Sequence, residues 1–385
     1  MSGDALSLFP ELVRDETELK TTGLLPSQRL EECIEAGYIR ASKPIRAEQV
    51  QPSSIDLRLG SVAYRVKASF LPSHTTVASK LKELLIAEID LSAPGELTKG
   101  NVYIVPLQEE LSLPAFLWGK ANPKSTTGRL DIFTRLLTDY AEEFEAVPNG
   151  YKGKLYAEIV PRTFSVIVSE GLRLNQLRLV KGNPPPSDTR LNALHEQEIL
   201  VYSQDDLPEA PVISKGLWLS LDLRGTQGSE IAGYRAKKNT RPIDLSRIDF
   251  YKASDYWYPI PKPPSGSLVL DPEEFYILAS KERVRIPPQY AAEMVPFDPA
   301  VGEFRIHYAG FFDPGFGYGS EELKGTHAVL EVRSHEVPFL VEDGQRVGRL
   351  VFEQMLAPPA KLYGRDIGSS YQFQGLALSK QFKRP

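Results

Sequence analysis

An internal repeat limits what this chain of 385 residues can fold into. Residues 54–58 (SIDLR) return as 220–224 (SLDLR), residues 101–107 (NVYIVPL) as 274–280 (EFYILAS), and residues 168–179 (VSEGLRLNQLRL) as 341–352 (VEDGQRVGRLVF). In each half a Leu-Pro or Ile-Pro pair follows the second match. The copies lie 166 residues apart at positions 54 and 220, and 173 apart at positions 168 and 341. Matches in one shared order favour duplication of one structural unit over a single large sandwich with chance resemblances.

The distribution of proline and glycine indicates what kind of unit is repeated. The chain holds 31 prolines and 28 glycines. Short alternating or apolar runs lie between them in both halves, which predicts many short strands. We therefore expect an all-β fold with a few short helices. The expected parts are an N-terminal arm (1–50) with a helix at 26–36, a first β domain (51–182), a linker (183–215) with a short helix at 192–201, a second β domain (216–360) and a C-terminal tail (361–385).

Composition excludes several classes of protein. The single cysteine, Cys33, excludes a disulfide framework within the chain and any zinc site built on paired cysteines. A formal net charge of -5 gives no reason to expect binding along a nucleic-acid backbone. No apolar run is long enough to cross a membrane, and residues 1–20 do not resemble a secretory signal. We expect a cytoplasmic protein without zinc, in which the histidines lie on the surface or are hydrogen-bonded in the core.

The two halves differ in a complementary way at two places. Residues 122–131 (NPKSTTGRLD) place a lysine, three hydroxyls and an arginine around a glycine, which suits a polyphosphate, although such a loop can also be a plain turn or a helix cap. The matching segment of the second half, 296–304 (PFDPAVGEF), lacks these groups. Conversely, the second half has the hairpin sequence Asp313-Pro-Gly-Phe-Gly, and the first half has only 148–153 (PNGYKG) there. This pattern predicts one composite site.

A carboxylate, Glu331, stands in the apolar run that follows the hairpin. Strand alternation allows a solvated Glu331, opposite Leu330 and Val332. If instead Glu331 faces a dry pocket, desolvation raises the pKa of its carboxyl towards neutrality, where one carboxylate can act in turn as base and acid. The first half keeps a glutamate at the matching position, Glu158, which we interpret as a structural relic rather than a second live site.

Five motifs in sequence order resemble those of the dCTP deaminase and dUTPase family. They are residues 52–60 (PSSIDLRLG), 124–129 (KSTTGR), 313–317 (DPGFG), 329–331 (VLE) and 371–375 (YQFQG). The match is nearest to the dCTP deaminases, in a double-length form. The resemblance implies tandem dUTPase-like domains, each a distorted β-barrel or jelly roll, assembly about a three-fold axis as a homotrimer, and active sites between adjacent domains.

The resemblance also implies a role for each matching residue. Glu331 corresponds to the catalytic acid and base, and Ser125 and Arg129 to the loop residues that position water and contact the nucleotide. Asp313 corresponds to the residue that faces the deoxyribose and excludes a ribonucleotide. The other expected contacts to the nucleotide are Lys124, Thr126, Val329, Tyr363 and Gln374. Mg²⁺ is expected on the triphosphate, with no metal ligand from the protein.

Departures from the family pattern leave alternatives open. Gly310 stands where the deaminases carry a histidine, Phe316 replaces a tryptophan, Ser370 replaces a lysine, and residues 319–325 are an insertion. The first expectation is hydrolysis of dCTP to dUTP and ammonia, a step in pyrimidine deoxynucleotide synthesis. The alternatives are a dUTP diphosphatase, a bifunctional enzyme that carries dCTP through to dUMP, or a non-catalytic nucleotide-binding regulatory protein. Glu331 favours the deaminase, because a dUTP diphosphatase needs no carboxylate at C4 of the base.

Overall fold

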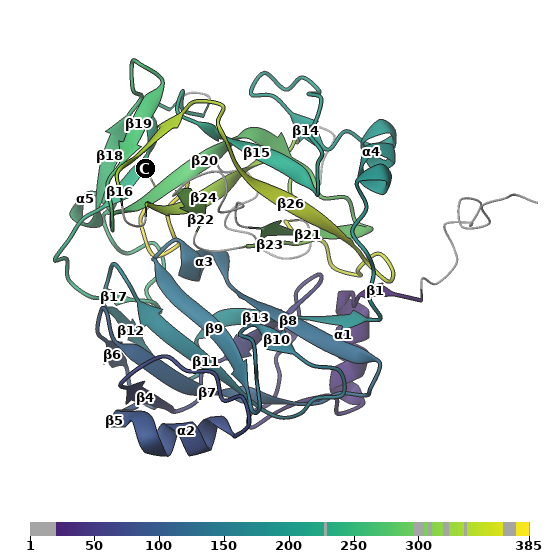
Figure 1. Ribbon diagram of the computed structural model, residues 1–385, viewed down its shortest axis with the longest axis vertical. Coiled ribbons are helices and arrows are strands. Elements are labelled where there is room, and N and C mark those ends of the chain that lie inside the picture. Colours follow the sequence, from purple (N-terminus) through teal and green to yellow (C-terminus); the bar gives the residue numbers. More distant parts are fainter. Residues whose placement is uncertain are drawn as a thin grey trace, which may run out of the picture.

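Strands dominate both halves of the protein (Figure 1). The computed structural model describes residues 21–226, 229–295, 304–306, 310–318, 323–334, 337–364 and 375–384. Within these ranges the chain forms two stacked lobes, the first half in purple and blue and the second in green and yellow. The expectation of an all-β fold with a few short helices is confirmed.

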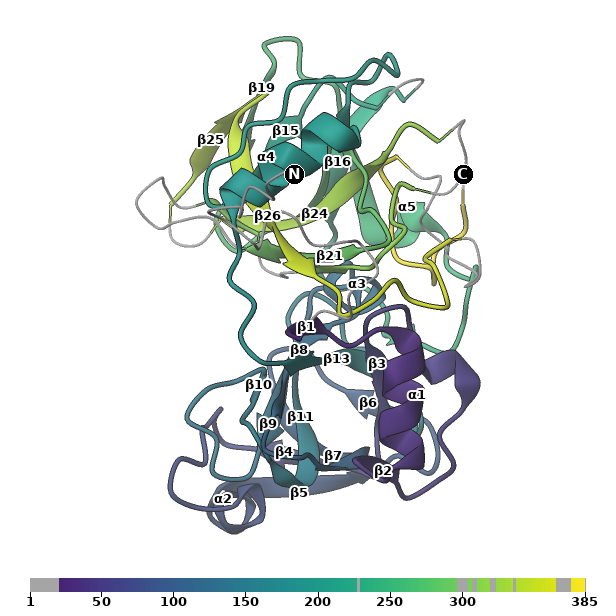
Figure 2. The same cartoon turned by 90° about the vertical axis from the view of Figure 1, so that its right-hand side faces the viewer.

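The first lobe consists of two main sheets, with α1 packed along one side (Figure 2). Its helices are α1 (Ser27–Glu35), the 3-10 turn η2 (Ala47–Gln49), α2 (Val77–Leu84) and α3 (Ser125–Gly128). Its strands are β1 (Gly23–Leu24), β2 (Ile39–Ala41), β3 (Ile55–Arg58), β4 (Val62–Val66), β5 (Leu85–Asp90), β6 (Gly95–Leu97), β7 (Val102–Ser112), β8 (Leu117–Pro123), β9 (Ile132–Thr138), β10 (Ala146–Val147), β11 (Lys152–Pro161), β12 (Val166–Val168) and β13 (Arg173–Lys181).

In the second lobe most of the described strands join into one 10-stranded sheet, beside the two-stranded sheet of β19 and β25. Its helices are α4 (Asp188–Gln197) and α5 (Ala253–Tyr256). Its strands are β14 (Val201–Tyr202), β15 (Leu217–Asp222), β16 (Ile231–Ala236), β17 (Ile243–Asp244), β18 (Trp257–Pro261), β19 (Ser267–Leu270), β20 (Phe275–Val284), β21 (Tyr290–Val295), β22 (Phe304–Ile306), β23 (Phe311–Phe312), β24 (Thr326–Ser334), β25 (Phe339–Glu342) and β26 (Arg346–Gln354).

The repeated sequence segments form strands that pair in the same way in both lobes. In the first lobe β13 lies between β3 and β8, and β7 lies between β4 and β11. In the second lobe β26 lies between β15 and β21, and β20 lies between β16 and β24. Both sets are antiparallel, so the repeated sequence segments form equivalent strands of one fold.

The two lobes share a sheet and a hydrophobic core. β17 of the second lobe pairs in parallel with β12 of the first, through Val166 with Ile243 and Ile167 with Asp244. One cluster of buried side chains includes Phe164 and Val166 of the first lobe with Trp257 and Phe275 of the second, and the indole of Trp257 meets the ring of Phe164 edge to face at 5.4 Å. The two lobes therefore share a strand pairing and one of their hydrophobic clusters.

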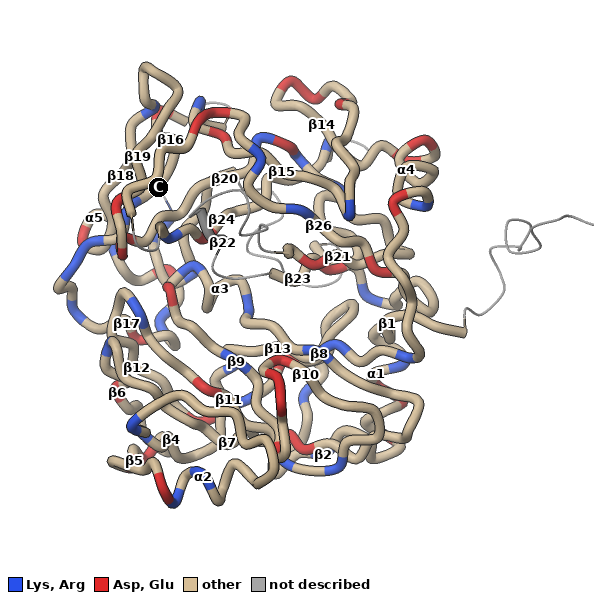
Figure 3. Tube along the Cα trace, viewed as in Figure 1, with Lys and Arg blue, Asp and Glu red and all other residues tan. Residues whose placement is uncertain are grey.

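The helix between the lobes begins earlier than predicted. α4 starts at Asp188 rather than at residue 192, because the Ser187 hydroxyl accepts a hydrogen bond from the Arg190 N–H (3.3 Å) and so caps the helix. Among the described residues no helix is long and apolar enough to cross a membrane. Lys and Arg are interspersed with Asp and Glu along the described trace (Figure 3).

Candidate active site between the two lobes

The loop that carries Ser125 and Arg129 forms a single helical turn, α3, which faces the second lobe (Figure 1). The turn is attached to β13 by two bonds to the carbonyl of Leu174, one from the Lys124 N–H (2.8 Å) and one from the Thr127 hydroxyl (3.1 Å). Residues four apart lie on the same side of a helical turn. The turn therefore presents Ser125 and Arg129 together.

Strand β24 presents Glu331 from the opposite side. Alternation along the strand places His327, Val329 and Glu331 on one face, while Ala328, Leu330 and Val332 pack into the core of the second lobe. Glu331 is only 6% exposed. The solvated position that alternation also allowed is therefore wrong.

A pocket of about 140 Å³ separates the α3 turn from β24. Its lining comes from both lobes: Gln51, Pro123, Lys124, Ser125, Arg129, Gln176, Met294, Gly310, Phe311, Phe312, Asp313, Phe316, His327, Val329, Glu331, Tyr363 and Gly375. Seven of the predicted site residues are in this set: Lys124, Ser125, Arg129, Asp313, Val329, Glu331 and Tyr363. Thr126 is not among the lining residues, and its carbonyl accepts a bond from the Ser379 hydroxyl (2.8 Å).

Some sequence predictions fall on residues outside the described ranges. Gln374 and Ser370 are two of these. Further ones are residues 1–20 of the expected N-terminal arm, residues 371–373 of the fifth motif, the second-half counterpart of the α3 loop except for the backbone of β22, and the first four residues of the 319–325 insertion.

Arg129 and Glu331 meet within one chain. The Arg129 Nε lies 4.0 Å from Glu331 Oε1, and both side chains are buried. Burial raises the pKa of the Glu331 carboxyl to about 7, and the charge of Arg129 offsets part of that rise. The Arg129 Nη1 also donates to the carbonyl of Ala377 (2.9 Å), so the C-terminal segment helps to position the guanidinium. Glu331 is thus a carboxyl group poised to exchange a proton near neutral pH.

The hairpin wall of the pocket carries Asp313. β23 pairs with β21, and Gly315 and Gly317 follow with φ of +95° and +63°. A Cβ at Gly317 would lie 2.0 Å from the carbonyl oxygen of Val284, so only glycine allows this close turn. The Asp313 carboxylate accepts a bond from the hydroxyl of Ser53 in the first lobe (Ser53 Oγ to Asp313 Oδ1, 2.6 Å). Both lobes therefore determine where this carboxylate lies.

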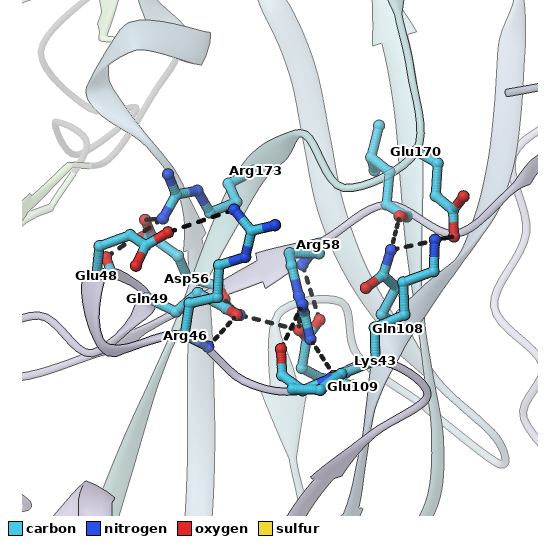
Figure 4. A network of polar contacts seen from close by, with 12 residues as sticks. Lys43, Arg46, Glu48, Gln49, Asp56, Arg58, Gln108, Glu109, Glu170 and Arg173 are labelled. Atoms are coloured by element: carbon cyan, nitrogen blue, oxygen red, sulfur yellow. Dashed lines mark hydrogen bonds and ion pairs between the residues drawn. The ribbon is translucent and has the colours of Figure 1, made fainter. Parts of the chain in front are cut away.

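The first repeated motif supports the basic end of the pocket. The side chain of Asp56 in β3 accepts a bond from Lys124 and lies 3.7 Å from Arg173. In the same strand the buried Arg58 side chain bonds Glu109 (Nε to Oε1, 2.7 Å), as Figure 4 shows. The motif thus fixes the carboxylate that positions Lys124.

Lys380 lies close to Lys124 and Arg173 at the basic end. Burial, with help from the nearby charges of Lys124 and Arg173, lowers the pKa of the Lys380 ammonium. Asp56 is the acidic group that offsets these charges.

The matching carboxylate of the first lobe has a different environment. Glu158 is fully buried and lies opposite Arg135 on β9, whose Nε donates to Glu158 Oε1 (3.1 Å). The guanidinium of Arg135 also packs on the ring of Phe144, 3.4 Å from its centroid. The carboxylate of Glu158 is paired with Arg135 of a neighbouring strand in its own lobe, whereas the carboxyl of Glu331 faces a pocket.

Sequence reasoning missed several residues of the site. His327 lines the pocket four residues before Glu331, and strand alternation was the signal that could have found it. Its Nδ1 lies 2.8 Å from the Ser280 carbonyl, and burial lowers the pKa of its imidazole. Gln51 and Gln176 line the pocket from the first lobe without any comparable local signal. No group of three or more His, Cys, Asp or Glu side chains suited to a metal ion occurs within the described ranges.

This fold and pocket define a class: tandem proteins of the dUTPase-like fold, with a buried carboxylate in a pocket between their two lobes. Residues 21–183 match the family described as 2'-deoxycytidine 5'-triphosphate deaminase N-terminal domain, and residues 187–382 match the C-terminal domain of the same family. The chain therefore belongs to the 2'-deoxycytidine 5'-triphosphate deaminase family.

Solved and curated relatives agree with this assignment. A crystal structure of 2'-deoxycytidine 5'-triphosphate deaminase from Agrobacterium tumefaciens is 49% identical in sequence, with a TM-score of 0.83, and the similarity covers 87% of this chain and 100% of that one. The dCTP deaminase of Halorubrum lacusprofundi is 29% identical over 187 residues, 48% of this chain and 83% of the relative. A dUMP-forming dCTP deaminase of Corynebacterium diphtheriae is 27% identical over 154 residues, 40% of this chain and 78% of the relative.

Proposed function

We propose that this protein hydrolyses dCTP to dUTP and ammonia, with Glu331 as the group that moves protons. The observation that carries the proposal is a buried glutamate whose carboxyl has a pKa of about 7, 4.0 Å from Arg129, in a pocket between the lobes. The names of the relatives, dCTP deaminase, give the substrate.

The proposed reaction uses Glu331 in alternating roles. The ionised carboxylate takes a proton from water as the water oxygen bonds to C4 of cytosine, and the carboxyl then protonates N3. The carboxylate next takes the hydroxyl proton of the adduct and delivers it to the amino nitrogen. The bond between C4 and this nitrogen breaks, and ammonia leaves a C4 carbonyl. A pKa near neutrality suits both the base and the acid step, because neither protonation state is then costly to reach.

The neighbouring residues have supporting roles in this proposal. Arg129 stabilises the ionised form of Glu331, and the Ser125 hydroxyl holds the attacking water. Val329 contacts the base, and Asp313 accepts a bond from the deoxyribose.

Lys124 lies at the basic end of the pocket and is the proposed triphosphate contact, together with Thr126, Tyr363 and Gln374. Mg²⁺ would reach the site on the triphosphate and neutralise part of its charge. The described pocket residues include no carboxylates besides Asp313 and Glu331, so no protein ligand to the ion is proposed.

Assembly as a homotrimer is also proposed, from the family resemblance alone, and a cytoplasmic location is proposed from the composition. The pocket as described needs only one chain, so trimer formation is not required to bring Arg129 to Glu331. Analytical ultracentrifugation would test the assembly, and a monomer at micromolar concentration would contradict it.

The experiment that tests the activity follows two products separately. The purified protein is incubated with dCTP, dUTP or CTP in the presence of Mg²⁺, and ammonia and pyrophosphate are measured. Ammonia from dCTP without pyrophosphate is the expected result. Absence of ammonia would refute the proposal, whereas ammonia with stoichiometric pyrophosphate would show that the product is dUMP.

A further inference from the structure

Arg178 is a fully buried arginine of the first lobe that reaches into the second. It lies on β13, directly behind the hairpin that lines the pocket. Its Nη1 donates to the carbonyl of Ala292 (3.1 Å) and its Nη2 to the carbonyl of Phe312 (3.0 Å). Ala292 and Phe312 are paired residues of β21 and β23. One planar guanidinium therefore joins both strands of this two-residue pairing.

The same guanidinium touches the side chains around Asp313. Nη2 lies 3.6 Å from Asp313 Oδ1, and Nη1 lies 3.3 Å from Glu353 Oε2. The Cζ of Arg178 stacks 3.9 Å from the ring centroid of Phe311. Backbone, carboxylate and aromatic ring of this pocket wall are thus all positioned by one residue of the other lobe.

Ser53 acts on the same carboxylate. Its hydroxyl, like the Arg178 guanidinium, contacts Oδ1 of Asp313. Among the described residues these contacts occupy Oδ1, so Oδ2 is the oxygen available to a ligand in the pocket. Two groups of the first lobe therefore determine how the carboxylate is presented.

The internal repeat provides an independent observation. With the offsets of the neighbouring matched segments, the counterpart of Ser53 is Leu219 and that of Arg178 is Val351, while the counterpart of Asp313 is Pro148. Ser53 and Arg178 occur only in the first copy, and Asp313 occurs only in the second. In the other copy each of them is replaced by a residue whose side chain has no hydrogen-bonding group. This joint pattern indicates that the three residues serve the one pocket rather than the general fold.

We propose that Arg178 is a specificity-positioning residue: from the first lobe it holds Phe312 and Asp313 where the pocket wall accepts a 2'-deoxyribose and has no room for a 2'-hydroxyl. This inference rests on the proposed function, in which Asp313 faces the sugar. A shift of the hairpin away from β13 would enlarge the space beside the sugar while leaving Glu331 on β24 in place. Loss of Arg178 therefore relaxes sugar selection more than it slows deamination of dCTP.

The test compares two conservative substitutions of buried interlobe arginines. R178K keeps the positive charge but lacks the planar guanidinium, whose fixed fork donates to two carbonyls while its face stacks on a ring. R333K is the matched control, because Arg333 of β24 also crosses between the lobes, to Asp131 and to the Thr163 hydroxyl (3.0 Å), without touching the hairpin. The readout is the ratio of kcat/KM for dCTP to that for CTP, with thermal unfolding followed in parallel.

We expect R178K to lower this ratio at least tenfold, mainly through faster turnover of CTP, and R333K to lower the melting temperature without changing the ratio. S53A should shift the ratio in the same direction by less, and it replaces R178K if that variant does not fold. An unchanged ratio in R178K would overturn the inference. If R178K does not fold, an unchanged ratio in S53A would overturn it instead. A fall in the ratio of R333K equal to that of R178K would also overturn it.

Binding separates this inference from the proposed activity. Calorimetric titration of E331Q chains with dCTP and CTP measures sugar selection without turnover. If the wild-type protein releases no ammonia, the proposed function fails, while the binding ratio with and without R178K still decides the role of Arg178. Equal affinity of E331Q for dCTP and CTP would overturn that role directly.

Discussion

Replacing Glu331 by glutamine separates the chemistry of the carboxyl from its effect on stability. Glutamine has nearly the same shape but does not exchange a proton, so E331Q should lose about 10²–10⁴-fold in ammonia release, the usual contribution of one acid and base group. Nucleotide binding should be largely retained. In the wild-type protein kcat/KM should rise with pH through about 7 and then level off, because the ionised carboxylate starts the reaction.

The stability change follows from the same pKa. Burial raises the pKa of the Glu331 carboxyl from its usual 4.5 to about 7, so between these values the folded protein binds more protons than the unfolded chain. The stabilisation from this group is complete below about pH 4.5 and is lost as pH rises through about 7. A rise of this size corresponds to about 3 kcal/mol. E331Q lacks this pH dependence. The free energy of unfolding of E331Q minus that of the wild type should therefore rise by up to about 3 kcal/mol between pH 4 and pH 8.

The assay is urea unfolding of both proteins at several pH values, together with ammonia release over a range of dCTP concentrations, which gives kcat and kcat/KM at each pH. Taking the difference between the two proteins cancels other titrating groups, including Glu145, whose carboxyl pKa burial raises to about 8. A stability difference that stays flat from pH 4 to pH 8 would contradict the buried position of Glu331. Turnover of E331Q within tenfold of the wild type would refute its role in proton transfer.

Three further outcomes are expected. Glu158→Gln should leave turnover within about twofold of the wild type while lowering the melting temperature, because it weakens a buried ion pair of the first lobe; a large loss of turnover would mean that the first lobe holds a live site. Mixing chains that carry Arg129→Ala with chains that carry Glu331→Gln should restore no activity, since both residues act within one chain; recovered ammonia release would show a site shared between chains. Gly317→Ala should raise KM for dCTP and lower the melting temperature, because a Cβ there would lie 2.0 Å from a backbone oxygen; kinetics and melting curves like those of the wild type would contradict the close turn.

Local sequence patterns predicted the fold class because the determining signals are local. Proline and glycine spacing, strand alternation and the repeated motifs each act over a few residues, and together they gave the all-β tandem arrangement. The complementary loss of the Lys124 loop and the Asp313 hairpin was also sufficient to predict a composite pocket. The pairing of β17 with β12 was not predicted, because strands of two and three residues leave no periodic signal.

The long-range polar contacts of the site could not be predicted from the sequence. Arg178 follows the alternation of an ordinary strand, where an arginine between leucines usually faces solvent. Its buried position depends on carbonyl groups more than a hundred residues away, those of Ala292 and Phe312. Ser53 and its bond to Asp313 pose the same problem, since a serine in a polar turn carries no sign of its distant partner.

The bond from Ser53 to Asp313 also shows what covalent linkage of two copies allows. In a symmetric assembly of identical subunits, each residue change appears in every subunit and alters both sides of every repeated contact at once. Two copies in one chain inherit changes separately. One copy could then keep the serine and arginine and lose the aspartate, while the other did the reverse, so broken symmetry made it possible for two formerly equivalent surfaces to specialise as the two walls of a single pocket.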